Sequence, residues 1–442
     1  QSAHPEFIYM PWTSPNRTTM DKRKTLYSDV VIIGAGLSGI NMACQLQRQL
    51  HVSDYVIYDR AQEMGGAWAA NNYPGCSVDI PGALYSLSWF PNPAFTSLFP
   101  SQREILSYIQ RVARANHITA HVRPQTEWEG ARWVEASSRW QVYLCDLTTG
   151  EGFLHEAKVL VSAVGGYTNP KLPVLPGLER FEGPVVHTAQ WEKEYDLRGL
   201  NVAVVGNGCI SILEKYWPLL IPSYDLGCRR RILDNNYVRT LRNPRMKLTK
   251  DTIAQVGPKS VMAESGREYP VDFIILATGF EFTQWKADAV IGRQGKSLKQ
   301  HWDDQGGIGA YKSVAMNEFP NMFYLLGPNS GSGHTSVLFA IECSVNLIIR
   351  IARPILQRQA LIVEVTKGAE VEWCDTIQTA LSKTVLTRTC SSVSFTAEHR
   401  LGFGPPANPA QCSNTPTRKV DGTSFHILSV HCVSGLARGF LQ

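Results

Sequence analysis

The feature that most constrains the fold is a glycine-rich turn that joins a short apolar strand to a helix. Residues 29–33 (DVVII) are typical of a buried parallel strand, and the glycines that follow have GxGxxG spacing. The first glycine permits a tight bend, the second lets the backbone approach a pyrophosphate, and the third allows close packing of helix on strand. The first N–H groups of the helix can then bind phosphate. The predicted phosphate-binding residues are Gly34, Gly36, Leu37, Ser38 and Gly39.

A second apolar strand, 55–58, ends at Asp59, twenty residues after the last glycine of the turn. A carboxylate at this place accepts hydrogen bonds from ribose hydroxyl groups. It would also repel a 2′-phosphate, so the pattern favours an unphosphorylated ribose. Strand, turn, helix and acidic residue together predict a βαβ unit that binds a dinucleotide, because an incidental glycine turn has no need of the acidic residue.

Helices and strands alternate along the rest of the chain, which predicts an α/β fold with a doubly wound, Rossmann-type sheet. Helices are expected at 40–49, 102–115 and 337–356, and further strands at 140–144, 159–163, 202–205, 273–276 and 322–326. The last helix carries Glu342, Arg350 and Arg353, so the sequence predicts a buried amphipathic helix there and no membrane span.

Composition excludes several classes of protein. The 442 residues are 44% hydrophobic and 18% charged, as expected of a globular chain with a large core. Basic residues cluster between 229 and 250, but no nucleic-acid-binding motif accompanies them, so a site for a phosphorylated cofactor fits them better. The ten cysteines have neither CxxC nor zinc-ligand spacing, which predicts free thiols and argues against a disulfide reductase. No secretory signal is visible, so we expect a cytoplasmic protein, although the first residue is Gln and an earlier start is open.

The segment 181–191, FEGPVVHTAQW, is more specific than the glycine turn. Its Phe181, Gly183, His187 and Trp191 match an FxGxxxHxxxW fingerprint, and the chain therefore resembles the Baeyer–Villiger flavin monooxygenases. Glu192 departs from the Pro or Asp that usually follows in the family. The resemblance covers residues 28–210 and 220–392 and includes the segments 65–68 (GGAW), 277–280 (ATGF) and 327–334 (GPNSGSGH).

The resemblance implies FAD and NADPH as cofactors, and O2 and a small-molecule ketone as substrates. Members of the family insert one oxygen atom beside the ketone carbonyl to give an ester or lactone. The resemblance also implies that Arg230 lies beside the flavin with Asp79 near it, and that His187 lies on the nicotinamide side and couples domain movement. The further FAD-binding residues that it implies are Gly66, Ala67, Trp68, Asp79, Tyr85 and Asn329.

A second glycine turn resembles the NADPH-binding turn of the family but lacks its third glycine. Gly206, Gly208 and Ser211 stand in place of GxGxxG, and only sixty residues separate Ser211 from Asp272. A complete nicotinamide domain needs further βα units, so we expect a truncated one. The predicted domains are an N-terminal arm (1–24), a discontinuous FAD domain (25–200 and 265–365), a remnant of the NADPH domain (201–264) and a C-terminal segment of unassigned structure (366–442).

Two functions stay open on the sequence alone. The first is an NADPH-dependent monooxygenase of the fungal secondary-metabolite kind, which acts on bulky polyketide or terpenoid ketones such as hydroxyversicolorone of the aflatoxin and sterigmatocystin route. The second is an FAD-binding protein without NADPH-dependent activity, because the NADPH domain is largely missing. The sequence leaves the ketone and the oligomeric state open.

Overall fold

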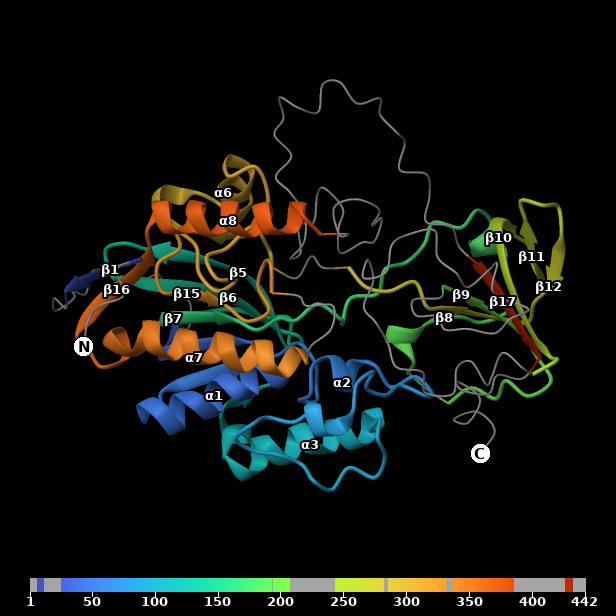
Figure 1. Cartoon of the computed structure of the whole chain (residues 1–442), viewed down its shortest axis with the longest axis horizontal. Coiled ribbons are helices and arrows are strands. Elements are labelled where there is room, and N and C mark those ends of the chain that lie inside the picture. The colour runs from blue at the N-terminus through green and yellow to red at the C-terminus, as the bar shows by residue number, and fades with distance from the viewer. Residues whose placement is uncertain are drawn as a thin grey trace.

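The computed structural model describes residues 6–11, 25–192, 194–206, 243–281, 285–330 and 336–384, and the backbone of 426–431. The described chain forms two lobes, and Figure 1 shows segments of the chain that pass between them. Each lobe is built on its own β-sheet. Within these ranges no helix combines the length and apolarity that a membrane crossing needs.

The sheet of the larger lobe has the strand order β14-β5-β6-β7-β2-β3-β4, and β15 pairs with β7. Its central strands run parallel, whereas β5, β6 and β7 form an antiparallel meander. A separate two-stranded ribbon joins β1 (Phe7–Pro11) to β16 (Ala360–Val365). The strands of the main sheet are β2 (Thr25–Ile33), β3 (Tyr55–Tyr58), β4 (Val122–Arg123), β5 (Thr126–Val134), β6 (Arg139–Asp146), β7 (Gly152–Ser162), β14 (Val290–Ile291) and β15 (Met322–Tyr324).

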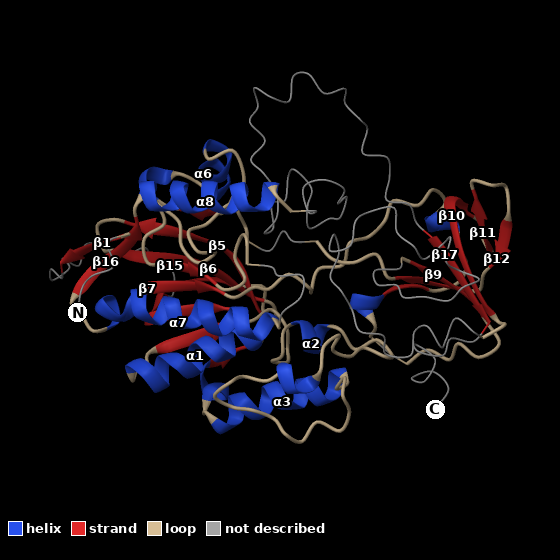
Figure 2. Cartoon of the chain, viewed as in Figure 1, coloured by secondary structure: helices blue, strands red, loops and turns tan. Residues whose placement is uncertain are grey.

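Helices lie over both faces of this sheet (Figure 2). On one side, α1 (Leu37–Leu50) packs against α7 (Val337–Leu356), and α3 (Gln102–Ala115) lies next to α1. On the other side lie α6 (Leu298–Asp304) and α8 (Lys367–Ser382). The short helix α2 (Ala67–Ala70) precedes α3 and contacts it. The layers therefore follow the order helix, sheet, helix that a doubly wound fold requires.

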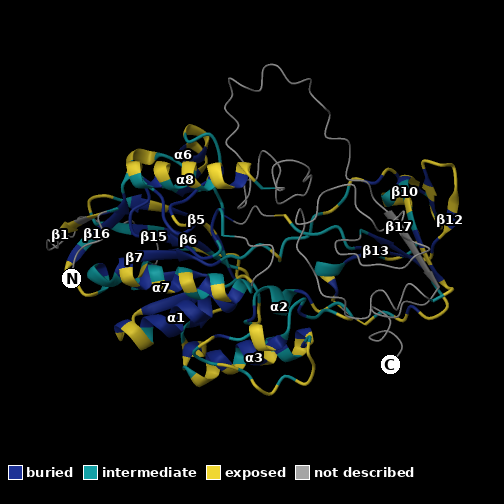
Figure 3. Ribbon diagram, in the orientation of Figure 1, coloured by how far each residue is buried: buried dark blue, intermediate teal, exposed yellow. Residues whose placement is uncertain are grey.

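The core is continuous on each face of the sheet because the strand residues alternate between the faces. Val30 and Ile32 of β2 pack in the cluster beneath α1 and α7, and Val31 and Ile33 pack in the cluster on the opposite face. Figure 3 shows the strands as the most buried layer and the outer faces of the helices as exposed. Burial on both faces explains why these strands read as unbroken apolar runs in the sequence.

The predicted fold class is confirmed, and most predicted elements are found. The helices at 102–115 and 337–356 have the predicted bounds. The first helix begins at Leu37 rather than residue 40, because Gly36 takes the N-cap position. The strand predicted at 322–326 ends at Tyr324, because Leu326 has a positive φ of 56° that bends the chain.

The second lobe holds a sheet with the order β12-β11-β10-β17-β9-β13-β8. Its strands β8, β9 and β13 are parallel, and the other described pairings are antiparallel. This sheet also contains β8, β12, β13 and β17, which lie outside the predicted range 201–264. β13 pairs with β9, and β8 pairs with β13. Its strands are β8 (Val185–His187), β9 (Asn201–Val205), β10 (Met246–Val256), β11 (Ser260–Ala263), β12 (Glu268–Pro270), β13 (Phe273–Leu276) and β17 (His426–His431).

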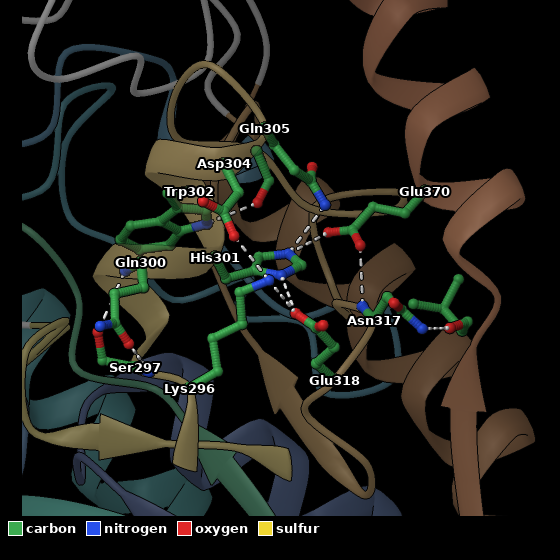
Figure 4. Close-up of polar contacts among 12 residues, drawn as sticks. Lys296, Ser297, Gln300, His301, Trp302, Asp304, Gln305, Asn317, Glu318 and Glu370 are labelled. Carbon is green, nitrogen blue, oxygen red and sulfur yellow. Dashed lines mark hydrogen bonds and ion pairs between the residues drawn. The ribbon is translucent and has the colours of Figure 1, made fainter. Parts of the chain in front are cut away.

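A buried polar cluster joins α6 to α8 in the larger lobe (Figure 4). His301 Nδ1 lies 3.0 Å from Glu318 Oε2, and its Nε2 lies 3.1 Å from Glu370 Oε1. Lys296 pairs with the same Glu318 at 2.9 Å and with Asp304 at 2.8 Å. Burial by itself lowers the pKa of His301, but the hydrogen bonds and charges of Glu370 and Glu318 outweigh it and raise the pKa. When protonated, the His301 ring can donate to both carboxylates, and its contact with Glu370 then links α6 to α8.

Candidate functional site

The glycine turn has the geometry that its sequence predicts. Gly34 has a φ of 109°, and a Cβ atom there would overlap the carbonyl group of Ala163. A Cβ atom at Gly39 would overlap the carbonyl of Gly34, so helix and strand approach too closely for any side chain. Both positions therefore require glycine for packing reasons.

The N-terminus of α1 is arranged to receive an anion. Gly36 is the N-cap residue, no side chain caps this helix, and its first turn contains no acidic residue in the described structure. Leu37 and Ser38 form that first turn and are buried. The first N–H groups of a helix lack partners within the helix and lie at the positive end of its dipole. The residues present therefore fit a pyrophosphate, as the sequence predicts.

Asp59 lies at the carboxyl end of β3, beside the glycine turn. Its Oδ2 accepts the backbone N–H of Ala35 at 2.6 Å, and its Oδ1 accepts that of Ala61 at 2.8 Å. Burial raises the pKa of Asp59, and the two N–H groups oppose this rise. The carboxylate is thus fixed against the turn, with lone pairs left for ribose hydroxyl groups.

The GGAW segment packs directly on the glycine turn. The N–H of Gly65 donates to the carbonyl of Ala35 at 3.1 Å, and a Cβ atom at Gly66 would lie 2.8 Å from the Cα atom of Gly36. α2 begins at Ala67, next to Trp68. The Nε1 of Trp68 donates to the hydroxyl of Tyr85 at 2.8 Å, and their rings meet edge to face with centroids 5.5 Å apart. The structure therefore brings the predicted residues Gly66, Ala67, Trp68 and Tyr85 together beside the turn.

Buried polar atoms without partners lie in the segments around this turn. Both side-chain polar atoms of Asn329 are buried and have no hydrogen-bond partner within the described structure, and Asn329 has a φ of 64°. Oδ1 of Asn71, directly after α2, and Oγ of Ser162, at the end of β7, are likewise buried and have no hydrogen-bond partner among the described residues. Leaving a buried polar group unpaired is costly, so such atoms fit a polar ligand. Asn71 and Ser162 were not predicted, because neither belongs to a spaced motif.

Asp79 lies half-buried in the loop that follows α2 and makes a polar interaction there. Its predicted neighbour Arg230 lies outside the described residues, as do Gly208 and Ser211 of the second turn. The pairing of Asp79 with Arg230 therefore stays a prediction.

Gly206 repeats the geometry of Gly34 in the second lobe. It has the same φ of 109°, and a Cβ atom there would overlap the carbonyl of Ala277, which follows β13. In the larger lobe the N–H of Ala163 donates to Ile33 at 2.8 Å, and here the N–H of Ala277 donates to Val205 at 2.8 Å. The structure therefore supports a second turn of the dinucleotide-binding type up to residue 206.

The fingerprint segment packs against the point where the chain returns from the second lobe. A Cβ atom at Gly183 would overlap the carbonyl of Asp272, and Trp191 is buried with its ring 5.2 Å from that of Tyr195. His187 ends β8, opposite Leu276 of β13, and its ring lies 6.2 Å from that of Phe280. The motif thus holds β8 on β13.

The tautomer of His187 follows from its contacts. Its Nδ1 accepts the backbone N–H of Ala189 at 3.0 Å, so in the neutral ring the proton is on Nε2. Burial lowers the pKa of His187, and the backbone of Gly279 partly offsets this effect. The ring is therefore neutral near pH 7 and suits a positioning role better than that of an acid.

Two segments cross between the lobes side by side. The N–H of Lys171 donates to Gly279 at 2.9 Å, and the N–H of Glu281 donates to Asn169 at 2.9 Å. Pro170 and Phe280 form an antiparallel bridge between these bonds. We call segments 163–171 and 277–281 the crossing ribbon, which links the two glycine turns.

Comparison with known proteins agrees with this architecture. Residues 32–100 match the family of NAD(P)-binding Rossmann-like domains. A Baeyer–Villiger monooxygenase of Streptomyces coelicolor is 28% identical over 491 residues, covering 90% of this chain and 92% of its own. The FAD-binding monooxygenase ktnD of Aspergillus niger is 26% identical, covering 80% of this chain and 74% of its own.

Solved structures of several monooxygenases share the fold of this chain. A steroid monooxygenase bound to NADP has a TM-score of 0.74 and 22% identity, over 86% of this chain and 95% of that one. Cyclohexanone monooxygenase in a rotated conformation has a TM-score of 0.71 and 23% identity, over 83% and 94%, and an open structure of a cyclohexanone monooxygenase is similar too. The alignment with the Streptomyces relative is longer than the 442 residues of this chain, so that relative has residues with no counterpart here.

Proposed function

We propose that this chain is a Baeyer–Villiger-type, FAD-binding monooxygenase that oxidises a ketone to an ester or lactone with NADPH and O2. Its relatives and its fold support this proposal. One observation carries the proposal. His187 lies against Leu276 of β13 and Phe280 of the crossing ribbon, Gly183 packs on Asp272 directly before β13, and Trp191 belongs to the apolar cluster that contains Phe273.

FAD fits the residues around the first turn. The N-terminus of α1 would hold the pyrophosphate and Asp59 the ribose, and Asn329 and Asn71 offer buried polar atoms to the ring system. When bound, the flavin supplies the hydride acceptor and the reaction with O2. The protein has to orient the cofactor and exclude water, which the buried setting of these residues favours.

NADPH is the proposed reductant, and Gly206 begins its binding turn. The overall balance is ketone, O2, NADPH and a proton giving ester, water and NADP⁺. We place Arg230 beside the flavin with Asp79 near it, where a guanidinium would stabilise negative charge at any working pH. His187 would set the position of the crossing ribbon through its contacts with Phe280 and Gly279.

The substrate class is proposed from similarity. We propose a role in fungal secondary metabolism, with a bulky polyketide or terpenoid ketone as substrate; the FAD-binding monooxygenase of Aspergillus niger is a fungal protein similar to this chain. Hydroxyversicolorone is one candidate to include in a panel of ketones.

The test uses the purified full chain loaded with FAD. Mixing with NADPH under anaerobic conditions is expected to remove the absorbance band of the oxidised flavin. A ketone panel under ¹⁸O2 is then expected to yield an ester or lactone that carries one labelled oxygen atom, detected by mass spectrometry. Absence of both NADPH oxidation and ester formation over the whole panel would overturn the proposal.

A second candidate is an FAD-binding protein that NADPH does not reduce. It is favoured by the described strands of the second lobe, where only β8, β9 and β13 run parallel, and by the relative's residues that have no counterpart here. The anaerobic experiment separates the two, because this candidate keeps an oxidised flavin with NADPH but is reduced by dithionite.

A further inference from the structure

We propose that Arg60 is a positioning residue that holds the crossing ribbon to the FAD-binding end of β3 and so sets the lobe orientation from which NADPH reduces the flavin. The inference rests on the proposed function for its part in flavin reduction. The contact itself is a property of the structure alone.

The guanidinium of Arg60 reaches one strand of the ribbon. Its Nη2 donates to Oγ1 of Thr168 at 3.0 Å and also donates to Oδ1 of Asn169. The carbonyl of Asn169 in turn accepts the N–H of Glu281, on the other strand. A single side chain therefore holds both strands of the ribbon, one directly and one through Asn169.

The backbone of Arg60 is fixed at the carboxyl end of β3, next to the proposed FAD-binding residue Asp59. It follows Asp59 directly, in a turn fixed by the bond from the Ala61 N–H to Asp59 Oδ1 and by the bond from the Asp59 N–H to the Arg123 carbonyl at 3.1 Å. The backbone of Arg60 cannot shift without moving the carboxylate proposed for the ribose. Through Arg60, the position of the crossing ribbon is therefore tied to the proposed ribose-binding residue Asp59.

A second tether acts on the same strand of the ribbon. The amide Nδ2 of Asn71 donates to the carbonyl of Tyr167 at 2.9 Å, and the ring of Tyr167 lies 5.6 Å from that of Phe280. Asn71 is buried, whereas Arg60 is exposed. Arg60 can therefore be substituted without disturbing the packing of the core, whereas Asn71 cannot.

A tether of this kind matters if the lobes take more than one orientation. Cyclohexanone monooxygenases, which share the fold, are described in open and rotated conformations. Hydrogen bonds that exist in one orientation only shift the population toward it. The charged, forked guanidinium can hold two acceptors together, which a lysine ammonium does with less geometric definition.

The experiment compares FAD-loaded full-length variants by stopped-flow reduction with saturating NADPH. Arg60→Met is expected to keep FAD and normal reduction by dithionite, but to be reduced by NADPH about fivefold more slowly, the scale of a lost exposed hydrogen bond. Asn169→Ala is expected to do the same, and the double variant to be no slower than either single variant. Arg60→Lys should recover part of the rate. Arg103→Met removes an exposed arginine of α3 and should change nothing.

Two results would overturn the proposal. The first is a rate of NADPH reduction in Arg60→Met within twofold of the wild-type rate. The second is a double variant in which the rate reductions of Arg60→Met and Asn169→Ala multiply. If NADPH does not reduce the wild-type protein, the proposed function fails and the tether is judged by hydrogen exchange. The amides of Lys171 and Glu281 should then exchange faster in Arg60→Met and not in Arg103→Met. Unchanged exchange would reject the tether itself.

Discussion

The backbone N–H of Ala35 donates to Oδ2 of Asp59 across 2.6 Å, which ties the middle of the glycine turn to the end of the neighbouring strand. The two residues come from different strand ends of one βαβ unit. The bond therefore fixes where a ribose would lie relative to the pyrophosphate-binding N-terminus of α1.

Replacing Asp59 with alanine is expected to lower FAD affinity. The variant loses the acceptor for the ribose and for the N–H groups of Ala35 and Ala61, and each bond to a charged group contributes about 1.5–3 kcal/mol. The dissociation constant should rise roughly tenfold to a hundredfold, measured by titrating apoprotein with FAD. Glu129→Ala, at an exposed position of β5, serves as the control. Wild-type affinity in a folded Asp59→Ala protein would refute the assignment of the ribose site.

Gly66→Ala tests the contact between the GGAW segment and the glycine turn. The new Cβ atom would lie 2.8 Å from Gly36 Cα, at a residue whose φ of 56° and ψ of −125° suit glycine alone. We expect a loss of about 1–3 kcal/mol in unfolding free energy and a loss of bound FAD. Urea unfolding and flavin content measure the two effects.

Gly150→Ala is the matched control, because Gly150 also has a positive φ, of 75°, but nothing lies within 4 Å of its added Cβ atom. It should lose some stability and keep its FAD. Equal flavin loss in both variants would show that backbone strain, and not the contact with Gly36, explains the result.

The glycine turn, Asp59 and the helices α3 and α7 could be predicted because each depends on residues close in sequence. Local spacing determines a strand–turn–helix unit, whatever the rest of the chain does. The contact of Arg60 with Asn169 could not be predicted, since the two residues are 109 positions apart and neither belongs to a periodic pattern.

The second lobe was harder to predict for the same reason. β17 pairs with both β9 and β10, although more than two hundred residues separate it from β9. Strand pairing over such a distance leaves no local mark in the sequence. The unpaired Oδ1 of Asn71 likewise becomes visible only once the surrounding atoms are placed.

The stability of the larger lobe is expected to fall at alkaline pH through His301. Because its pKa is raised in the folded state, its contribution is complete below the ordinary value of about 6.5 and is lost as the pH rises through the raised value. The unfolding free energy that His301 contributes should therefore decline as the pH rises above about 6.5. Glu370→Gln removes one of the facing carboxylates and should flatten this decline, although Glu318 still faces the ring.

The comparison is made by urea unfolding at several pH values. His117→Asn replaces an exposed histidine outside the cluster and should keep the slope of wild type. A decline of the same size in Glu370→Gln and in wild type would show that His301 does not cause it.

The kinetic role of His187 can be separated from acid–base chemistry by its pH dependence. Burial lowers the pKa of His187, so the ring is neutral above the ordinary value of about 6.5 and has no charge to lose between pH 6.5 and 8.5. The rate of flavin reduction by NADPH should have no step from this residue in that range. His187→Asn places an amide oxygen where Nδ1 accepts the Ala189 N–H, and it should stay within about threefold of wild type, whereas His187→Ala should be about tenfold slower. If both variants are slowed equally and a step in the wild-type profile vanishes in them, His187 transfers a proton and the positioning role is wrong.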